Sequence, residues 1–165
     1  RLGRLLITFL FCAEGTLREP LLYLSLYFKQ HRQQYYDLLQ SVRLTGDWEA
    51  WVRFFLTGVE ETANQAGQTA KALMKLAAAD EQRIQTIGKA SGSALLVHRL
   101  LQAQPILSIA SSCEELKLSV PTVTASLKHL AKLGIARETT GRNYGRIYAY
   151  DKYLKTLNEG TEPLN

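Results

Sequence analysis

The sequence predicts a mainly α protein, in which a helical bundle is followed by a winged helix-turn-helix domain with a small β-hairpin. Three observations support this prediction. Apolar residues recur at the three- and four-residue spacing of buried helix faces through residues 1–92. Residues 93–160 show the order helix, helix, helix, hairpin, which is typical of a winged helix. Basic residues are concentrated in this second segment, because residues 116–156 hold eight Lys or Arg and two Asp or Glu.

The first predicted helix begins at the start of the chain. Its apolar face is formed by residues three and four apart: Leu2, Leu5, Leu6, Phe9 and Leu10. Gly15 is a suitable C-terminal stop, and Glu19-Pro20 interrupts the chain because a residue before proline avoids helical dihedrals. No capping residue precedes the helix, and the first residue is Arg1 rather than Met. We therefore expect the chain to be a piece of a longer protein.

The rest of residues 1–88 is also predicted to be helical and to complete the first domain. A helix covers residues 21–43 with a kink near Phe28, and Gly46-Asp47 forms a turn followed by a helix cap. After that cap an aromatic seam recurs at helical spacing, formed by Trp48, Trp51, Phe55 and Val59.

A linker of small and polar residues, 89–92, separates this domain from the second one, residues 93–160, and residues 161–165 form a tail. Pro105 stops the first helix of the second domain. The elements predicted there are helices over 93–104, 109–116 and 119–133, strands over 135–139 and 147–150, and a last short helix that Asp151 caps.

The third of these helices is predicted to face DNA. Its buried face is formed by Val123, Leu127, Leu130 and Leu133. The opposite face is expected to present residues whose hydroxyl or imidazole groups reach base edges, with lysines that reach phosphates. These candidates are Thr122, Ser126 and His129, flanked by Lys128 and Lys132. Lys117 occupies the turn position that often holds glycine, and Cys113 is expected to pack at a helix crossing.

The hairpin tip is the second candidate contact with DNA. Arg142, Tyr144 and Arg146 alternate around two glycines, so two guanidinium groups and one ring would project together. Guanidinium groups suit phosphate or a narrow minor groove. The alternative is a surface hairpin that packs against a neighbouring domain, since many winged helices serve protein contacts.

Composition excludes several other classes of protein. Of the 165 residues, 46% are apolar and 21% are charged, with a net charge of +5, as in ordinary globular proteins. Cys12 and Cys113 form no CxxC motif, which argues against a disulfide framework or a zinc finger and favours the cytoplasm. The longest apolar run, residues 5–13, is about half of the ~20 residues that a membrane span needs, so we expect no membrane association.

Several spaced motifs carry a resemblance to a known family. They are Arg1-Leu-Gly-Arg4, Tyr23-Leu-Ser-Leu-Tyr27, His31-Arg-Gln-Gln-Tyr35-Tyr36, Gly46-Asp47-Trp48-Glu-Ala-Trp51 and Phe54-Phe55-Leu56. The chain resembles the C-terminal two-thirds of Fic-family proteins, which transfer AMP from ATP to protein hydroxyls and carry the signature HxFx(D/E)GNGRxxR. The first motif looks like the last four residues of that signature. The others are similar to segments that follow it in a bacterial branch with a C-terminal winged helix.

The resemblance implies a nucleotide site at the start of the chain. Arg1, Gly3 and Arg4 would lie at the ATP phosphates, and Tyr35 and Tyr36 near the adenine. In the full-length protein, ATP with magnesium would be the donor and a protein hydroxyl the acceptor. The signature histidine, the acidic residue that positions magnesium and the Gly-Asn-Gly nest are absent from this sequence. The fragment alone is therefore expected to be inactive, with no catalytic residue, no metal ligand and no tightly bound cofactor.

Two other interpretations of the sequence remain. In one, the chain is a transcriptional regulator without enzymatic activity, in which the winged helix binds double-stranded DNA and the helical part forms a homodimer. In the other, the arginines at the start of the chain bind a nucleotide as a regulatory ligand. Two arginines without the phosphate nest would bind it weakly.

Overall fold

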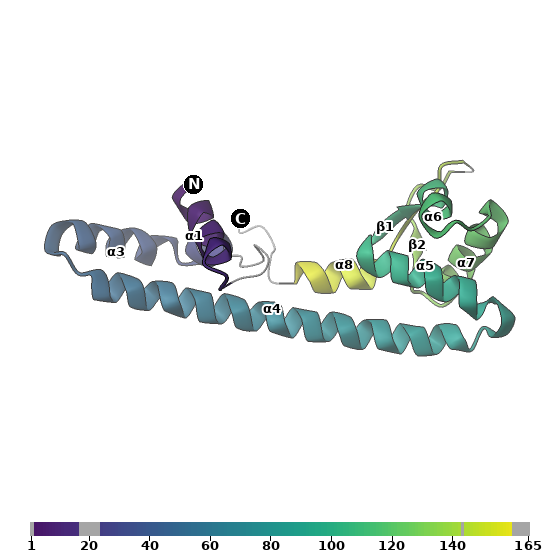
Figure 1. The fold of residues 1–165 in the computed structure, drawn as a ribbon, viewed down its shortest axis with the longest axis horizontal. Coiled ribbons are helices and arrows are strands. Elements are labelled where there is room, and N and C mark those ends of the chain that lie inside the picture. Colours follow the sequence, from purple (N-terminus) through teal and green to yellow (C-terminus); the bar gives the residue numbers. More distant parts are fainter. Residues whose placement is uncertain (1, 17–23, 143, 160–165) are drawn as a thin grey trace. The chain divides into compact units, whose positions relative to one another are not determined.

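The computed structural model describes residues 2–16, 24–142 and 144–159. In this part of the chain the fold is mainly α, as predicted, with eight α-helices and one three-stranded antiparallel sheet near the C-terminal end (Figure 1). None of the described helices is both long enough and apolar enough to cross a membrane. The chain forms two compact units that divide at residue 68.

The first unit contains α1 (Leu2–Ala13), α2 (Leu24–Gln30), α3 (Arg32–Thr45) and the beginning of α4 (Trp48–Gln85). The helix α1 ends close to Gly15, which has a positive φ of 69°, so the predicted stop is confirmed. The segment predicted as one kinked helix is instead two helices, α2 and α3, that meet at His31.

The turn between α3 and α4 has the predicted chemistry. Gly46 caps α3 in the left-handed region with φ of 71°, and its N–H donates to the carbonyl of Val42 at 3.0 Å. The Asp47 carboxylate then accepts the N–H of Ala50 at 3.2 Å and so satisfies one free donor of the α4 N-terminus. The turn and the cap are therefore both confirmed.

Aromatic rings form the core of the first unit. Leu24, Tyr27, Phe28 and Phe54 are buried, and partly buried rings pack around them. Trp51 and Phe55 of the predicted seam stack on each other, with centroids 5.5 Å apart. Trp48 also contacts Trp51, with centroids 6.4 Å apart, but its side chain is 63% exposed and lies outside the core. Phe54 lies on the side of α4 that faces the core instead.

The second unit begins inside α4 and continues to residue 160. Its sheet has the strand order β1-β3-β2, and β3 pairs antiparallel with both neighbours, with Leu107 and Glu138 opposite Tyr148. Strand β1 was not predicted. The elements after α4 are a 3₁₀ turn (Gly88–Ala90), α5 (Ser91–Ala103), β1 (Ile106–Ser108), α6 (Ile109–Leu116), α7 (Val120–Lys132), β2 (Arg137–Glu138), β3 (Ile147–Ala149) and α8 (Asp151–Asn158).

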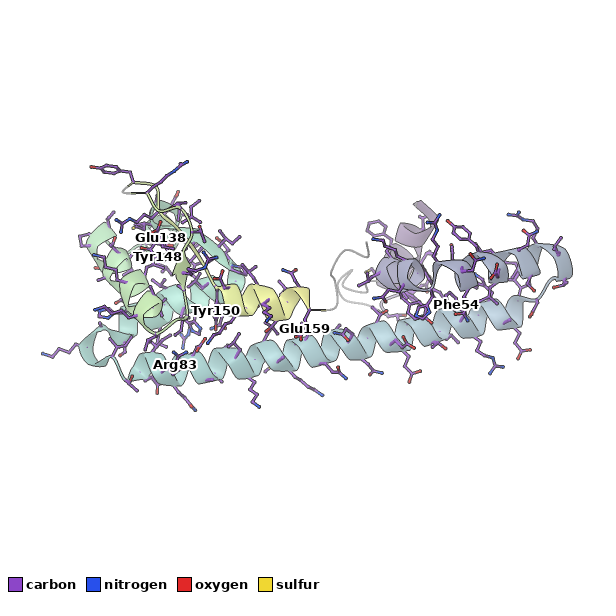
Figure 2. The ribbon with its side chains drawn as sticks, turned by 180° about the vertical axis from the view of Figure 1, so that it is seen from behind. Phe54, Arg83, Glu138, Tyr148, Tyr150 and Glu159 are labelled. Atoms are coloured by element: carbon purple, nitrogen blue, oxygen red, sulfur yellow. The ribbon has the colours of Figure 1, made fainter. Side chains whose placement is uncertain are left out.

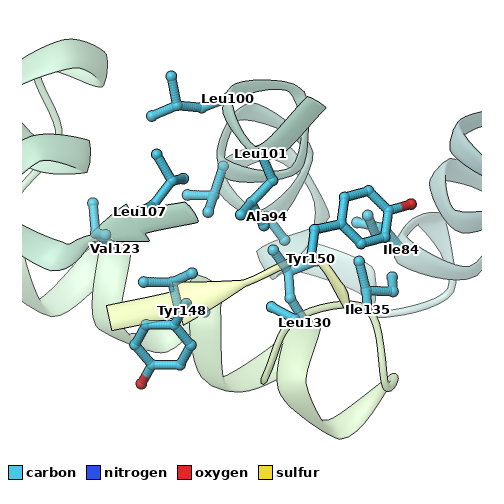
Figure 3. Close-up of a cluster of buried hydrophobic side chains, with 13 residues drawn as sticks. Ile84, Ala94, Leu100, Leu101, Leu107, Val123, Leu130, Ile135, Tyr148 and Tyr150 are labelled. Carbon is cyan, nitrogen blue, oxygen red and sulfur yellow. The ribbon is translucent and has the colours of Figure 1, made fainter. Parts of the chain in front are cut away.

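The core of the second unit lies between α5, α7 and the sheet, and the end of α4 contributes to it (Figure 3). Ile84 of α4 is completely buried there with Ala94 and Tyr150. Cys113 packs against this core, as expected from the sequence. Residues 89–92, predicted as a linker, are part of the 3₁₀ turn and the first turn of α5, so the structure divides the chain inside α4 rather than at this segment.

A buried polar network joins α4 to the rest of the second unit. The Tyr150 hydroxyl donates to the Asp80 carboxylate at 2.6 Å and lies 3.4 Å from Nε2 of His98. Arg83 pairs with Asp80 at 2.7 Å and also donates to the carbonyl of Leu133. Figure 2 labels Arg83 and Tyr150 in this unit. Burial and the hydrogen bond to Asp80 raise the pKa of Tyr150, while burial lowers the pKa of His98. A buried carboxylate is tolerated here because it is both paired and hydrogen-bonded.

Candidate nucleic-acid interface

The helices α6 and α7 and the turn between them are fixed by local hydrogen bonds. Ser108 caps α6 in a capping box with Ser111, and the Ser119 hydroxyl accepts the N–H of Thr122 at the start of α7. Lys117 ends α6 with φ of 53°, and it is the one non-glycine residue with positive φ in the part of the chain that the structure describes. The turn therefore uses a left-handed position, as its sequence indicated.

The buried side of α7 is the predicted one. Val123, Leu127 and Leu130 are completely buried against α5 and α6, and Leu133 is partly buried. The side chains that are exposed on the opposite side of α7 follow each other at spacings of four, three and four residues. They are Pro121, Ala125, Lys128 and Lys132.

The residues predicted to face DNA from α7 are divided by the structure. Lys128 is exposed, and Thr122 and His129 are half-buried. The Thr122 hydroxyl lies 2.8 Å from that of Ser119, so it takes part in the helix cap. Ser126 is only 1% exposed, and its hydroxyl donates to Ser93 of α5 at 3.0 Å. The prediction that Ser126 faces DNA was therefore wrong, because its side chain is enclosed at the helix crossing.

Helix geometry explains this correction. Successive residues turn by about 100° around a helix axis, so Ser126 lies only about 60° from Val123 and stays on the buried side. Ala125 lies about 160° from Val123, almost on the opposite side of the helix, and faces outward. Ala125 is not among the predicted contacts, because its side chain is small and apolar, although the methyl group of alanine can contact the methyl group of thymine.

The hairpin between β2 and β3 is held by one acidic side chain. The Glu138 carboxylate accepts the hydroxyl of Thr140 at 2.6 Å and the N–H of Gly141 at 2.8 Å. The hydrogen bond from Thr140 is the main cause that lowers the pKa of Glu138. The N–H of Thr139 donates to the carbonyl of Ile147 at 2.9 Å and extends the pairing of the strands. Glu138 thus orders the base of the loop.

The tip of this hairpin projects the predicted residues. Tyr144 is 90% exposed and Arg142 is exposed, whereas Arg146 is half-buried. Nε of Arg146 donates to the Arg142 carbonyl at 2.8 Å, which closes the tip. A ring and two cations are therefore presented on one short loop.

The basic side chains of this unit differ in their ion pairs. Arg137 is bound by the carboxylate of Asp151, and Arg99 lies 3.7 Å from Glu81. Within the described residues, no ion pair occupies the five basic groups of the α6–α7 turn, α7 and the hairpin tip. These are Lys117, Lys128, Lys132, Arg142 and Arg146. In the described part of the chain, none of the five is bound to a carboxylate in an ion pair, although the charge of Arg146 contributes to the lowered pKa of Glu138.

The residues predicted to bind a nucleotide lie in the first unit. Arg1 lies outside the described residues; Gly3 and Arg4 belong to the first turn of α1, and the Arg4 side chain is likewise outside the description. Tyr35 is half-buried and stacks on Phe28 with centroids 5.0 Å apart. Tyr36 is 54% exposed, and the Arg32 guanidinium lies 5.8 Å from its ring centroid. Tyr35 is thus largely a core residue, and Tyr36 offers the more accessible ring.

Across residues 2–16, 24–142 and 144–159, no group of three or more His, Cys, Asp or Glu side chains could hold a metal ion. Compared with models of known protein families, the chain matches none.

Proposed function

We propose that residues 69–160 form a winged helix-turn-helix that binds double-stranded DNA. The observation that carries this proposal is the set of five basic side chains without ion pairs on α7, the turn before it and the hairpin tip. The order of helices and the three-stranded sheet support the winged-helix assignment. Phosphate groups attract such unpaired cations, whereas cations already bound to carboxylates would lose a partner on binding.

The proposal gives each element a separate role. Lys128 and Lys132 on the exposed side of α7 contact phosphates, while Ala125 on the same side contacts base edges in the major groove. The hairpin tip places Arg142 and Arg146 at the neighbouring backbone or minor groove. The phosphate contacts supply affinity without sequence preference, and the contact of Ala125 with base edges supplies specificity.

Fluorescence anisotropy with a labelled duplex tests this proposal on the whole chain. Lys128→Ala/Lys132→Ala and Arg142→Ala/Arg146→Ala each remove two cations, so each should lower the salt slope of binding by about two. The affinity for all duplex sequences should fall by about 10-fold or more at low salt, because phosphate contacts carry non-specific binding.

A matched control uses exposed lysines away from the proposed interface. Lys71→Ala/Lys75→Ala removes the same charge from α4 and should change the affinity by less than threefold if contact, rather than total charge, matters. An equal loss of affinity in all three double variants would indicate that the total charge of the chain, rather than contact at this surface, attracts the duplex. If no duplex binds at low salt, the alternative applies, in which the unit makes contacts with another protein.

We infer, as a second function, that the chain is part of a Fic-type protein that transfers AMP from ATP to a protein hydroxyl. The segments that carry the resemblance contribute Tyr27, Tyr35, Phe54 and Phe55 to one aromatic cluster around Phe28. Gly3 and Arg4 lie in the first turn of α1, where backbone N–H groups favour phosphate. These two features support a nucleotide site built on the first unit.

In this reaction the residues of this chain would bind ATP, the AMP donor, and would not activate the acceptor hydroxyl. Arg4 would hold phosphate, and the exposed Tyr36 ring would lie near the adenine. None of the three histidines stands in an HxFx(D/E)GNG motif, so the general base must come from such a segment. A fusion of this segment before Arg1 should transfer label from ATP labelled at the α-phosphate to a protein. Absence of transfer with every candidate substrate would contradict the inference.

The nucleotide-sensor alternative can be tested on the present chain. If its own residues bind ATP as a regulatory ligand, millimolar ATP should raise its melting temperature through linkage. An unchanged melting temperature removes that alternative and leaves the AMP-transfer inference intact, because the latter requires an HxFx(D/E)GNG segment that this sequence does not contain.

A further inference from the structure

A stripe of apolar side chains lies exposed along α4 in the first unit. Trp48, Val52 and Leu56 follow each other at intervals of four residues and are 63%, 42% and 57% exposed. Together with Glu49 and Arg53 they line a shallow groove. We call these five residues the α4 stripe.

The stripe is distinct from the core-facing side of α4. Phe54 and Gly58 are buried against α2. Because successive residues turn by about 100° around the helix axis, these two residues lie on another side of α4 than Trp48, Val52 and Leu56. A helix that packs with one side alone needs no second apolar side. Contiguous exposed apolar groups with a charged edge are typical of an interaction surface.

We propose that the α4 stripe binds the α4 stripe of a second copy of this chain, with the two helices antiparallel around a two-fold axis at Val52. In this arrangement Val52 meets Val52 of the other copy, and each Trp48 meets a Leu56. A surface that pairs with itself must be complementary to itself under this rotation. The apolar residues of the stripe satisfy that condition because their spacing is symmetric about Val52.

The charges of the stripe satisfy the same condition. Glu49 and Arg53 lie on one flank of the stripe and form an exposed ion pair at 2.9 Å. Because a helix rises about 1.5 Å per residue, Glu49 lies about 4.5 Å before Val52 and Arg53 about 1.5 Å after it. The two-fold axis places Arg53 of the other copy about 3 Å along the axis from Glu49, on the same flank. Two ion pairs can then form between the copies.

The charge balance favours a second copy over a strongly charged partner. The stripe holds one acidic and one basic side chain, so its formal charge is zero. An acidic or basic partner would meet one attractive and one repulsive group there. The stripe alone is short for a stable interface, so we expect a concentration-dependent dimer in the micromolar range rather than a permanent one. This inference does not depend on DNA binding or on AMP transfer.

Sedimentation velocity over a range of concentrations tests the proposal on the full chain. The 18.5 kDa chain should shift toward twice that mass as its concentration rises. Val52→Arg should raise the dissociation constant by about 30-fold or more, the effect of losing one central side chain of an interface. Met74→Arg is the matched control, because Met74 is a 73% exposed apolar residue elsewhere on α4, and it should leave the constant unchanged.

Charge reversal tests the antiparallel register. Glu49→Arg or Arg53→Glu alone places like charges across the axis and should raise the dissociation constant by about 10-fold or more. The double variant E49R/R53E exchanges the two charges and restores complementarity, so it should dimerise like the unchanged chain. Failure of the double variant to recover association, while its helix content is unchanged, would overturn the charge pairing.

Cross-linking identifies the orientation directly. In a background without Cys12 and Cys113, a mixture of Trp48→Cys and Leu56→Cys chains should form a disulfide between the two variants. Each variant alone should stay uncross-linked. Disulfides in Trp48→Cys alone would indicate parallel helices and overturn the proposal. A monomer at every concentration, or a dimer that Val52→Arg leaves intact, would overturn it as well.

Discussion

Two glycines of α4 allow one substitution to be compared in two environments of the same unit. A Cβ atom at Gly58 would lie 2.5 Å from Cδ1 and 2.6 Å from Cε1 of Tyr27, whereas one at Gly67 would meet no atom within 4 Å. Tyr27 is only 7% exposed and is packed against Phe28 and Phe54, so its ring has little room to move. Gly58→Ala should therefore destabilise the first unit, and Gly67→Ala should stabilise it.

The magnitude follows from two opposing terms. Alanine favours a helix interior over glycine by about 0.8–1 kcal/mol, and both variants gain this amount. Overpacking a well-filled core costs about 1–3 kcal/mol, and only Gly58→Ala incurs this cost. Gly67→Ala should thus gain about 1 kcal/mol, and the free energies of unfolding of the two variants should differ by about 1–3 kcal/mol.

Urea unfolding of the whole chain, followed by tryptophan fluorescence, measures this difference, because both tryptophans lie in the first unit. The slope with denaturant should stay constant between the variants, so that the midpoints report stability alone. Equal midpoints for Gly58→Ala and Gly67→Ala would refute the close approach of α2 and α4 at Gly58. A gain from Gly58→Ala would do the same.

Three further predictions concern the second unit. Tyr150→Phe removes a hydrogen bond to the buried carboxylate of Asp80 and should lower the free energy of unfolding in urea by about 1.5–3 kcal/mol. The Tyr148 hydroxyl makes no hydrogen bond among the described residues, so Tyr148→Phe should cost far less. Equal costs would contradict the network. Lys117→Gly removes the steric cost of a side chain in the left-handed region, so the free energy of unfolding should stay unchanged or rise by up to about 1 kcal/mol. A loss of stability would contradict the φ of 53°. Burial lowers the pKa of His98 in the folded state, so the unfolded chain binds the proton first and stability should fall as the pH drops below about 6.5. In His98→Gln this part of the pH dependence should disappear, and an unchanged profile would contradict it.

Local signals in the sequence were sufficient to predict α6 and α7. Ser119 caps α7, Leu116 ends α6 and Lys117 takes the left-handed position, because each of these roles depends on a few neighbouring residues. The apolar spacing of Val123 and Leu127 likewise gave the buried side of α7 directly. The hairpin tip was found from two glycines and the alternation of residues between them.

Features that depend on distant residues were not predicted. Strand β1 is three residues long and exists because it pairs with β3, forty residues later in the chain, so no local period reveals it. The end of α4 belongs to the second unit because Asp80 and Ile84 meet Tyr150 and the core there. The small polar residues after α4 suggested a boundary, although they form a tight turn between two helices of one unit.

The error at Ser126 has a different origin. The angle of Ser126 relative to Val123 was available from the sequence, but serine was placed outside because it is polar. Its hydroxyl is buried without penalty because Ser93 of α5 accepts its hydrogen bond, a partner 33 residues away. Ala125 was not among the predicted contacts, because only polar and charged residues of α7 were considered for DNA binding.

The salt dependence of duplex binding by the unaltered chain tests the central claim most directly. If Lys117, Lys128, Lys132, Arg142 and Arg146 meet phosphates, the logarithm of the binding constant should fall linearly with the logarithm of salt concentration. The slope should be about −4 to −5, or −0.9 for each of the five contacts. A slope near zero, or no binding at low salt, would contradict DNA binding by this surface.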